Sequence, residues 1–192
     1  CEVANRRETR YACAHIPIQV IQNSMLFRGE LLEFSTNAFR IALTISPPQT
    51  FQCLAPDKPL NLIVYDANEL VFTGDFKILK SDPGRRVREF VLEPRIQPIQ
   101  RYNAKVYRSK RIELKPAPNI VFRHPLTKQT VNLKVLDLSG SGLSALEGVG
   151  HSLLLPGMML NDVELLFADS LALHFKAQVL YRNPQADDDG SG

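Results

Sequence analysis

The sequence predicts an all-β protein built from two small antiparallel β-barrels in tandem. Short runs in which apolar and polar residues alternate recur along the chain, and such alternation is typical of strands with one buried face. The 13 prolines and 10 glycines favour tight turns over long helices. The same order of runs occurs twice, at an offset of about one hundred residues, and a fixed offset indicates a duplicated unit.

The first unit is expected to span residues 1–95. A basic stretch at its start leads into an apolar run, and later runs alternate with the period of two that strands require. The apolar share of the whole chain, 44%, is enough to give each unit a core. We expect strands in this unit at residues 16–20, 59–64, 69–78 and 86–92, the last of them after a proline-glycine turn at 82–84.

The second unit is expected to span residues 108–192, after a basic connector at residues 96–107. Prolines and the loss of alternation at about residues 94–100 suit a linker between domains. The matched segments are 6–10 with 108–111, 16–20 with 112–114, 33–38 with 137–142, 59–64 with 159–165, and 69–78 with 170–179. Nothing in the second unit matches residues 86–92, so we expect the second barrel to lack its last strand.

Two strands of the second unit stand out by their alternation. In the first, Val131, Leu133 and Val135 are separated by polar residues. The second is the clearest strand in the chain, because one face is apolar over six alternate positions and the other carries a histidine, a lysine, a glutamine and an arginine. Its apolar face consists of Leu171, Leu173, Phe175, Ala177, Val179 and Tyr181.

The first of these strands ends in a cluster of small polar residues. Asp137 and Ser139 are two residues apart, so their side chains should point to the same side of the strand. Gly142 follows three residues later, where a glycine lets the backbone turn and leaves room beside the polar groups. Arg108 and Arg111 lie upstream in the connector region and at the start of the second unit. The sequence therefore predicts a small polar pocket floor with arginines close to it.

These residues resemble the PilZ family, the bacterial receptors for cyclic di-GMP. The family signature combines RxxxR in an N-terminal loop with (D/N)xSxxG on a strand, and Asp137, Ser139 and Gly142 complete the second motif. The first motif departs from the pattern, because Tyr107 stands four residues before Arg111. The order of a barrel-like domain, a basic linker and a PilZ domain is similar to the flagellar-brake class. The resemblance implies two PilZ-type split barrels.

The resemblance also implies a ligand site. Arg108 and Arg111 would wrap cyclic di-GMP, Asp137 and Ser139 would bond one guanine, and Gly142 would keep the floor open. Arginine suits this role because its guanidinium binds phosphate through two hydrogen bonds, meets the guanine edge and stacks on a purine. The chain would be a cytoplasmic cyclic di-GMP effector in which ligand binding changes the angle between the two domains and so alters a partner contact, with no cofactor and no metal. The partner would be a protein of the flagellar, pilus or polysaccharide machinery.

A second, weaker ligand site is expected in the first unit. Arg6 and Arg10 have the family spacing, and Glu33 and Ser35 stand where Asp137 and Ser139 stand in the second unit. Glu33 replaces the usual aspartate or asparagine, and an alanine occupies the position of the glycine.

Other interpretations of these residues stay open. Asp137 and Ser139 can cap the strand end through a local turn, and the arginines can face solvent or a protein. The chain would then be a PilZ-type protein-protein interaction module that binds no ligand. General nucleic-acid binding by a barrel face is a third possibility, but the net charge of only +3 argues against it.

The sequence does not favour an enzyme. A GxGxxA stretch at residues 140–145 is not followed by a sequence that would form the helix a dinucleotide site needs, and there is no GxSxG elbow. The four histidines have no metal-ligand spacing. The three cysteines show no CxxC pair, which fits a reduced cytoplasm. No apolar run is long enough to span a membrane.

Overall fold

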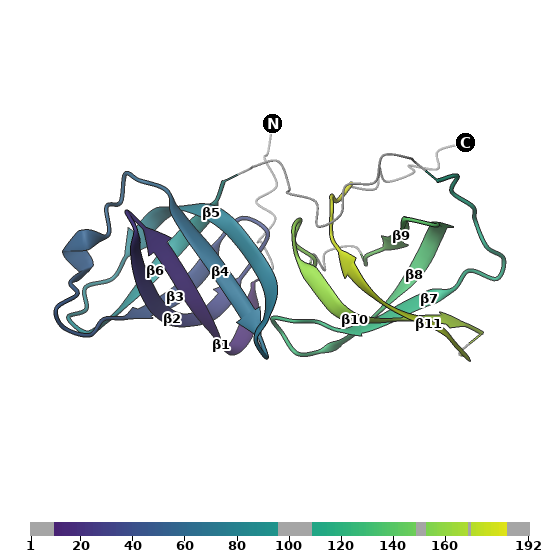
Figure 1. The fold of residues 1–192 in the computed structure, drawn as a ribbon, viewed down its shortest axis with the longest axis horizontal. Coiled ribbons are helices and arrows are strands. Elements are labelled where there is room, and N and C mark those ends of the chain that lie inside the picture. Colours follow the sequence, from purple (N-terminus) through teal and green to yellow (C-terminus); the bar gives the residue numbers. More distant parts are fainter. Residues whose placement is uncertain (1–9, 96–108, 149–152, 169, 184–192) are drawn as a thin grey trace, which may run out of the picture.

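The structure is a computed structural model that describes residues 10–95, 109–148, 153–168 and 170–183 (Figure 1). Over these residues the chain is all-β, as predicted, with a single short 3-10 helix, η1 (Phe51–Cys53). The strands of the first half are β1 (Tyr11–Gln22), β2 (Met25–Phe34), β3 (Phe39–Thr44), β4 (Leu60–Asp66), β5 (Glu69–Ser81) and β6 (Val87–Pro94). Those of the second half are β7 (Asn119–Arg123), β8 (Thr130–Ser139), β9 (Gly142–Leu146), β10 (Met159–Phe167) and β11 (Ser170–Gln178). None of the described residues forms a helix long and apolar enough to cross a membrane.

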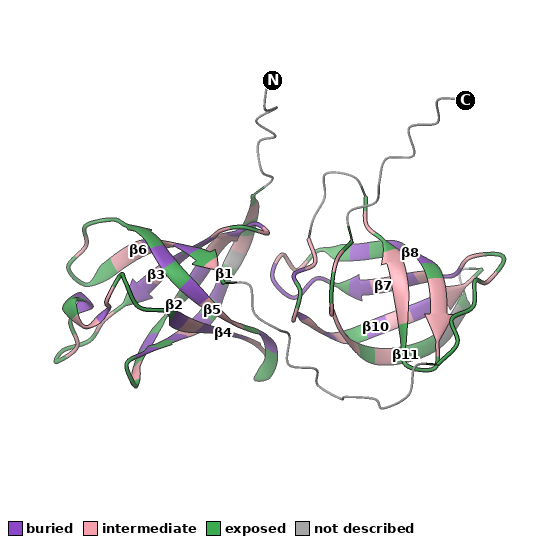
Figure 2. Ribbon diagram, turned by 90° about the horizontal axis from the view of Figure 1, so that it is seen from above, coloured by how far each residue is buried: buried purple, intermediate pink, exposed green. Residues whose placement is uncertain are grey.

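The first half is a closed antiparallel barrel in the order β1-β2-β3-β6-β5-β4, with β4 paired back to β1. Closure leaves no free strand edge. Apolar side chains at alternate positions fill the interior, and Figure 2 shows buried and exposed residues alternating along the strands. Phe39 lies at the centre of an aromatic cluster, with its ring centroid 5.6 Å from that of Phe72 and 4.8 Å from that of Phe76.

The second half is a curled five-stranded sheet in the order β11-β10-β7-β8-β9. This is the order β5-β4-β1-β2-β3 of the first barrel, so the two halves share one plan and the predicted duplication is confirmed. The described residues contain no counterpart of β6 between β9 and β11. Consequently the inward residues of β9 are less well covered: Phe39 and Ile41 of β3 are at most 1% exposed, whereas Leu143 and Ala145 of β9 are only half-buried.

The alternation of residues 131–135 predicted β8 correctly. Val131, Leu133 and Val135 are buried and the residues between them are exposed. The alternation of residues 171–181 predicted the existence of β11, which ends at Gln178, but its apolar face is covered only in part: Phe175, Ala177 and Val179 are half-buried. Leu173 is 54% exposed and Tyr181 is 60% exposed. The register shifts opposite the start of β11, and an edge strand lacks the neighbour that would cover such residues.

The predicted match of residues 112–114 with the strand at residues 16–20 is wrong. The strand that pairs like β1 is β7, and residue 112 contributes only one isolated bridge, to Leu138 of β8. Two prolines, Pro116 and Pro118, stand between that bridge and β7, and proline cannot donate to a strand ladder. The bridge has its own counterpart in the first half, where Tyr11 pairs with Phe34. Arg10 and Arg111 therefore occupy equivalent positions, each immediately before the residue that pairs.

Side chains from both halves meet in one contact region. The rings of Phe34 and His124 stack with centroids 5.8 Å apart and an interplanar angle of 3°. Lys128 forms an ion pair with Asp66 at 2.5 Å, and Lys176 of β11 forms one with Glu69 of β5 at 2.9 Å. Residues 96–108 lie outside the described residues, so the predicted linker is not described.

Candidate functional site

The motif residues lie on the hairpin that joins β8 to β9. Ser139 and Gly142 face each other as the last pair of the ladder, and the two residues between them form the turn. The Ser139 hydroxyl donates to the carbonyl oxygen of Gly142 at 2.9 Å and accepts from the backbone N–H of Ser141 at 3.4 Å. Ser139 therefore stabilises its own turn, which is one of the two roles that the sequence left open.

Asp137 is held by side chains rather than by its own backbone. It lies opposite Ser144 of β9, next to a register shift in the β8–β9 ladder. The Nη1 atom of Arg111 donates to its Oδ1 atom at 2.5 Å, and the Asp137 side chain is 28% exposed. The pKa of Asp137 is lowered, mainly by a hydrogen bond from the Ser144 side chain and also by Arg111, against the opposing effect of partial burial. Asp137 is therefore an anion at neutral pH.

Backbone pairing places Arg111 at this position. Ile112 and Leu138 exchange two backbone hydrogen bonds of 2.9 Å, which fix the segment before β7 against the end of β8. Arg111 precedes Ile112 in the chain, as Asp137 precedes Leu138. Because the guanidinium has five N–H donors and the Arg111 side chain is 44% exposed, donors remain that can meet an incoming anion.

The two glycines of the hairpin differ in their surroundings. A Cβ atom built on Gly142 would meet no atom within 4 Å, and Gly142 does not have a left-handed φ angle. The turn itself does not require a glycine there, contrary to the turn-forming role expected from the sequence. A Cβ atom on Gly140 would lie 3.4 Å from the Ser109 hydroxyl oxygen. Gly142 thus leaves open space at the hairpin, and its role beside a ligand stays a prediction.

The equivalent hairpin of the first half, between β2 and β3, has a different polar arrangement. Glu33 accepts a hydrogen bond from Arg40 at 3.0 Å. Ser35 is 1% exposed, and its hydroxyl bonds the backbone of Ala38 as donor and as acceptor. Arg10 is exposed. The weaker site stays a prediction, with its serine enclosed and its acid already bonded to a cation.

Two residues of the predicted sites, Arg6 and Arg108, lie outside the described residues, as does Tyr107. The structure brings Arg111, Asp137, Ser139 and Gly142 together on one hairpin. Sequence reasoning missed Ser144, although a signal existed. A two-residue turn after Ser139 makes position 144 the partner of position 137. Within the described residues no three histidine, cysteine or acidic side chains form a group that could hold a metal ion.

Comparison with known proteins gave structural neighbours only. No family model matches the chain, and no curated protein matches it in sequence. One neighbour is YcgR from Escherichia coli in complex with cyclic di-GMP, at 18% identity and a TM-score of 0.33, with 88% of this chain and 70% of that chain covered. Another is the Borreliella burgdorferi PlzA protein in complex with cyclic di-GMP, at 12% identity and a TM-score of 0.37, with 90% and 81% covered.

A third neighbour is the inhibitor of motility MotI from Bacillus subtilis, at 12% identity and a TM-score of 0.32, with 90% of this chain and 82% of that chain covered. All three matches cover most of this chain, at 12 to 18% identity.

Proposed function

We propose that this chain is a cyclic di-GMP receptor whose binding site is the rim of the β8–β9 hairpin. The observation that supports it most directly is the backbone bridge between Ile112 and Leu138, which brings Arg111 onto Asp137. The site would comprise Arg111, Asp137, Ser139 and Gly142, with Arg108 added from the start of the second domain.

The chemistry of the ligand matches these groups. Asp137 is an anion with two acceptor oxygens, and the Watson-Crick edge of guanine offers N–H donors. Arg111 has donors left for a phosphate or for the O6 and N7 atoms of guanine, where a guanidinium binds through two hydrogen bonds. The contact between Arg111 and Asp137 holds both groups in place before the ligand arrives, which lowers the entropy cost of binding.

We extend the proposal to a regulatory effector that acts in the cytoplasm. Arg108 and Arg111 stand at the start of the second domain, just after the connector, because we place the connector at residues 96–107 between a domain of residues 1–95 and a domain of residues 108–192. Ligand contacts to Arg108 and Arg111 would fix the connector and change how the halves meet. A protein partner would then bind the new arrangement of the two halves. Its binding would compete with the contact between Phe34 and His124 and with the neighbouring ion pairs, which join the halves.

Isothermal titration of the whole chain with cyclic di-GMP tests the proposal. Losing one charge-assisted contact should weaken binding about tenfold to a hundredfold, so we expect this loss in Arg111→Ala and in Asp137→Ala. Arg123→Ala is the matched control, because Arg123 is an exposed arginine on β7 with no part in the proposed site. The absence of binding heat with the intact chain would refute the proposal.

One set of contacts favours a second function, a PilZ-type module that docks proteins without a ligand. Asp137 already bonds Arg111 and Ser144, and Ser139 already bonds the turn, so the motif can serve the hairpin alone. In that case Arg111→Ala and Asp137→Ala would lower the stability of the hairpin, and cyclic di-GMP would leave the melting temperature of the intact chain unchanged. A melting temperature that rises with ligand concentration excludes this alternative.

A further inference from the structure

A cavity of about 460 Å³ lies in the first barrel, remote from the β8–β9 hairpin. It lies beside η1, at the end of the barrel farthest from the second half (Figure 1). One wall is the loop at residues 45–52 between β3 and β4, and the other is the turn at residues 84–88 that enters β6. The backbone N–H of Ile45 donates to the carbonyl of Arg86 at 3.0 Å, so the two walls are joined.

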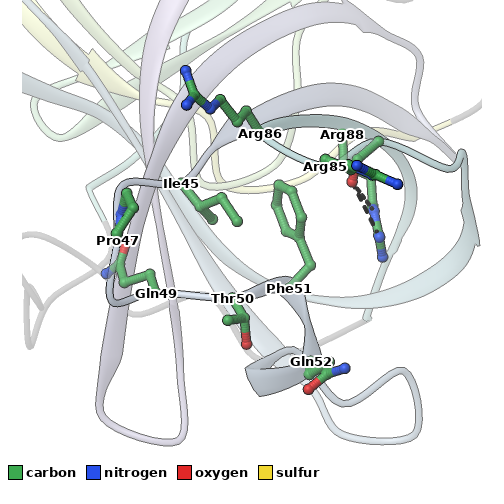
Figure 3. A pocket seen from close by; sticks show the side chains of 10 residues that line it. Ile45, Pro47, Gln49, Thr50, Phe51, Gln52, Arg85, Arg86 and Arg88 are labelled. Carbon is green, nitrogen blue, oxygen red and sulfur yellow. Dashed lines mark hydrogen bonds between the residues drawn. The ribbon is translucent and has the colours of Figure 1, made fainter.

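Arg88 is held rigidly in this cavity. Its guanidinium lies 4.7 Å from the centre of the Phe51 ring, which is a cation-π contact. Its Nε and Nη2 atoms both donate to the carbonyl oxygen of Gly84 at 3.2 Å (Figure 3). A Cβ atom on Gly84 would come within 1.9 Å of the Val87 carbonyl oxygen, so this turn needs a glycine. The turn and the aromatic ring together place a fixed positive charge over an apolar floor.

Two further arginines, Arg85 and Arg86, lie at the exposed rim. The nearest acidic residues along the chain have other partners: Glu89 forms an ion pair with Arg40 at 3.7 Å, and Asp82 forms one with Lys80 at 3.4 Å. Over the described residues, no carboxylate forms an ion pair with Arg85, Arg86 or Arg88. The cavity therefore keeps three positive charges that the described part of the protein does not neutralise.

We infer that this cavity binds a small phosphate-bearing molecule of nucleotide size. Its volume falls in the range of small-molecule sites, about 300 to 1,000 Å³. Guanidinium groups bind phosphate oxygens through paired hydrogen bonds, and Ile45, Pro47 and Phe51 give the organic part of the ligand an apolar surface.

An extended acidic peptide fits this cavity less well than a small molecule. Peptides that bind β-proteins in extended form add a strand to a free sheet edge. Both strands that lead to the cavity, β3 and β6, are paired on each side within the closed barrel, so no edge is free there. A compact ligand held by side chains does not need such an edge.

The test is isothermal titration of the whole chain with GTP and, separately, with inorganic pyrophosphate. Arg85→Gln/Arg86→Gln removes two exposed charges without touching the Arg88 contacts, and GTP binding should weaken at least about tenfold. Lys77→Gln/Lys134→Gln is the matched control, because it removes two exposed charges away from the cavity and should change GTP affinity less than about twofold.

Three results would overturn the inference. They are a GTP affinity unchanged in Arg85→Gln/Arg86→Gln, a pyrophosphate affinity equal to that of GTP, and a glutamate hexapeptide that binds more tightly than GTP. Binding of GTP to Asp137→Asn should equal binding to the intact chain, because Asp137 lies on a different domain. That variant separates this site from the proposed cyclic di-GMP site, so each can fail independently of the other.

Discussion

His124 should make the stability of this protein fall as the pH is lowered. Its side chain is completely buried, its Nε2 atom lies 3.0 Å from the carbonyl oxygen of Leu153, and its Nδ1 atom accepts from the backbone N–H groups of Leu126 and Thr127 at 3.2 and 3.1 Å. A proton on Nδ1 would remove that acceptor and leave the backbone N–H groups of the buried Leu126 and the half-buried Thr127 without this partner.

Burial is the main reason why the pKa of His124 is lowered in the folded state. The nearby Lys128 charge lowers the pKa further, and the hydrogen bond to Leu153 opposes the shift. Because the folded pKa lies below the unfolded value, the unfolded chain takes up the proton first as the pH falls. Stability is therefore complete above the unfolded pKa of 6.5 and is lost below it, until the folded pKa is reached.

The size of the loss follows from one proton per molecule. If the folded state takes none, the free energy of unfolding falls by about 1.4 kcal/mol between about pH 7.5 and about pH 5.5, which is the upper bound. Urea unfolding followed by circular dichroism at several pH values measures it. His124→Asn keeps one acceptor and one donor but does not titrate, so its stability should vary less over this pH range. An equal slope in both proteins would refute the reasoning.

Two further substitutions and one chemical reaction test the packing of the first barrel. Gln22 is 3% exposed and its amide bonds both backbone groups of Ala55, so Gln22→Leu should cost about 2 to 3 kcal/mol in urea unfolding. A Cβ atom on Gly29 would lie 2.0 Å from the Ala42 carbonyl oxygen, so Gly29→Ala should lower the free energy of unfolding by about 2 kcal/mol or more. Burial, and next Glu33, raise the pKa of Cys13 to about 12, so iodoacetamide should modify this thiol only after unfolding, as mass spectrometry will measure.

Each of the two substitutions has a control. Gly142→Ala places a methyl group in open space and should change stability by less than about 0.5 kcal/mol. Gln49→Ala removes one exposed amide contact, to the Leu26 carbonyl, and should cost much less than the change at Gln22. A Gly29→Ala protein as stable as Gly142→Ala, or rapid alkylation of Cys13 in the native state, would contradict the packing described.

The duplicated plan could be predicted from the sequence, because alternating apolar residues and turn residues are local signals. The match of residues 33–38 to 137–142 is confirmed, because each segment joins two strands that pair with each other, β2 with β3 and β8 with β9. The match of residues 16–20 to 112–114 failed, because a short apolar pair such as Ile112 and Leu114 has the same pattern whether it forms one bridge or a strand. The two prolines that follow were the better guide.

The candidate site was predictable only in part. The motif gave Asp137, Ser139 and Gly142, since all three are close in sequence. It did not show that Ser144 bonds Asp137, which depends on pairing across the hairpin. Nor did it indicate the arginine cavity, because residues 45–52 and 84–88 are far apart in the chain and meet only through the order of strands in the closed barrel.

The sequence by itself determined the all-β class, the repeated plan and the strand whose end carries the DxSxxG motif, because each depends on residue spacing along one strand or turn. Only the tertiary structure decided that Ile112 pairs with Leu138 and so places Arg111 on Asp137, and that three arginines surround a cavity at the far end of the first barrel. Both depend on contacts between distant segments, which backbone pairing and core packing fix but local composition does not.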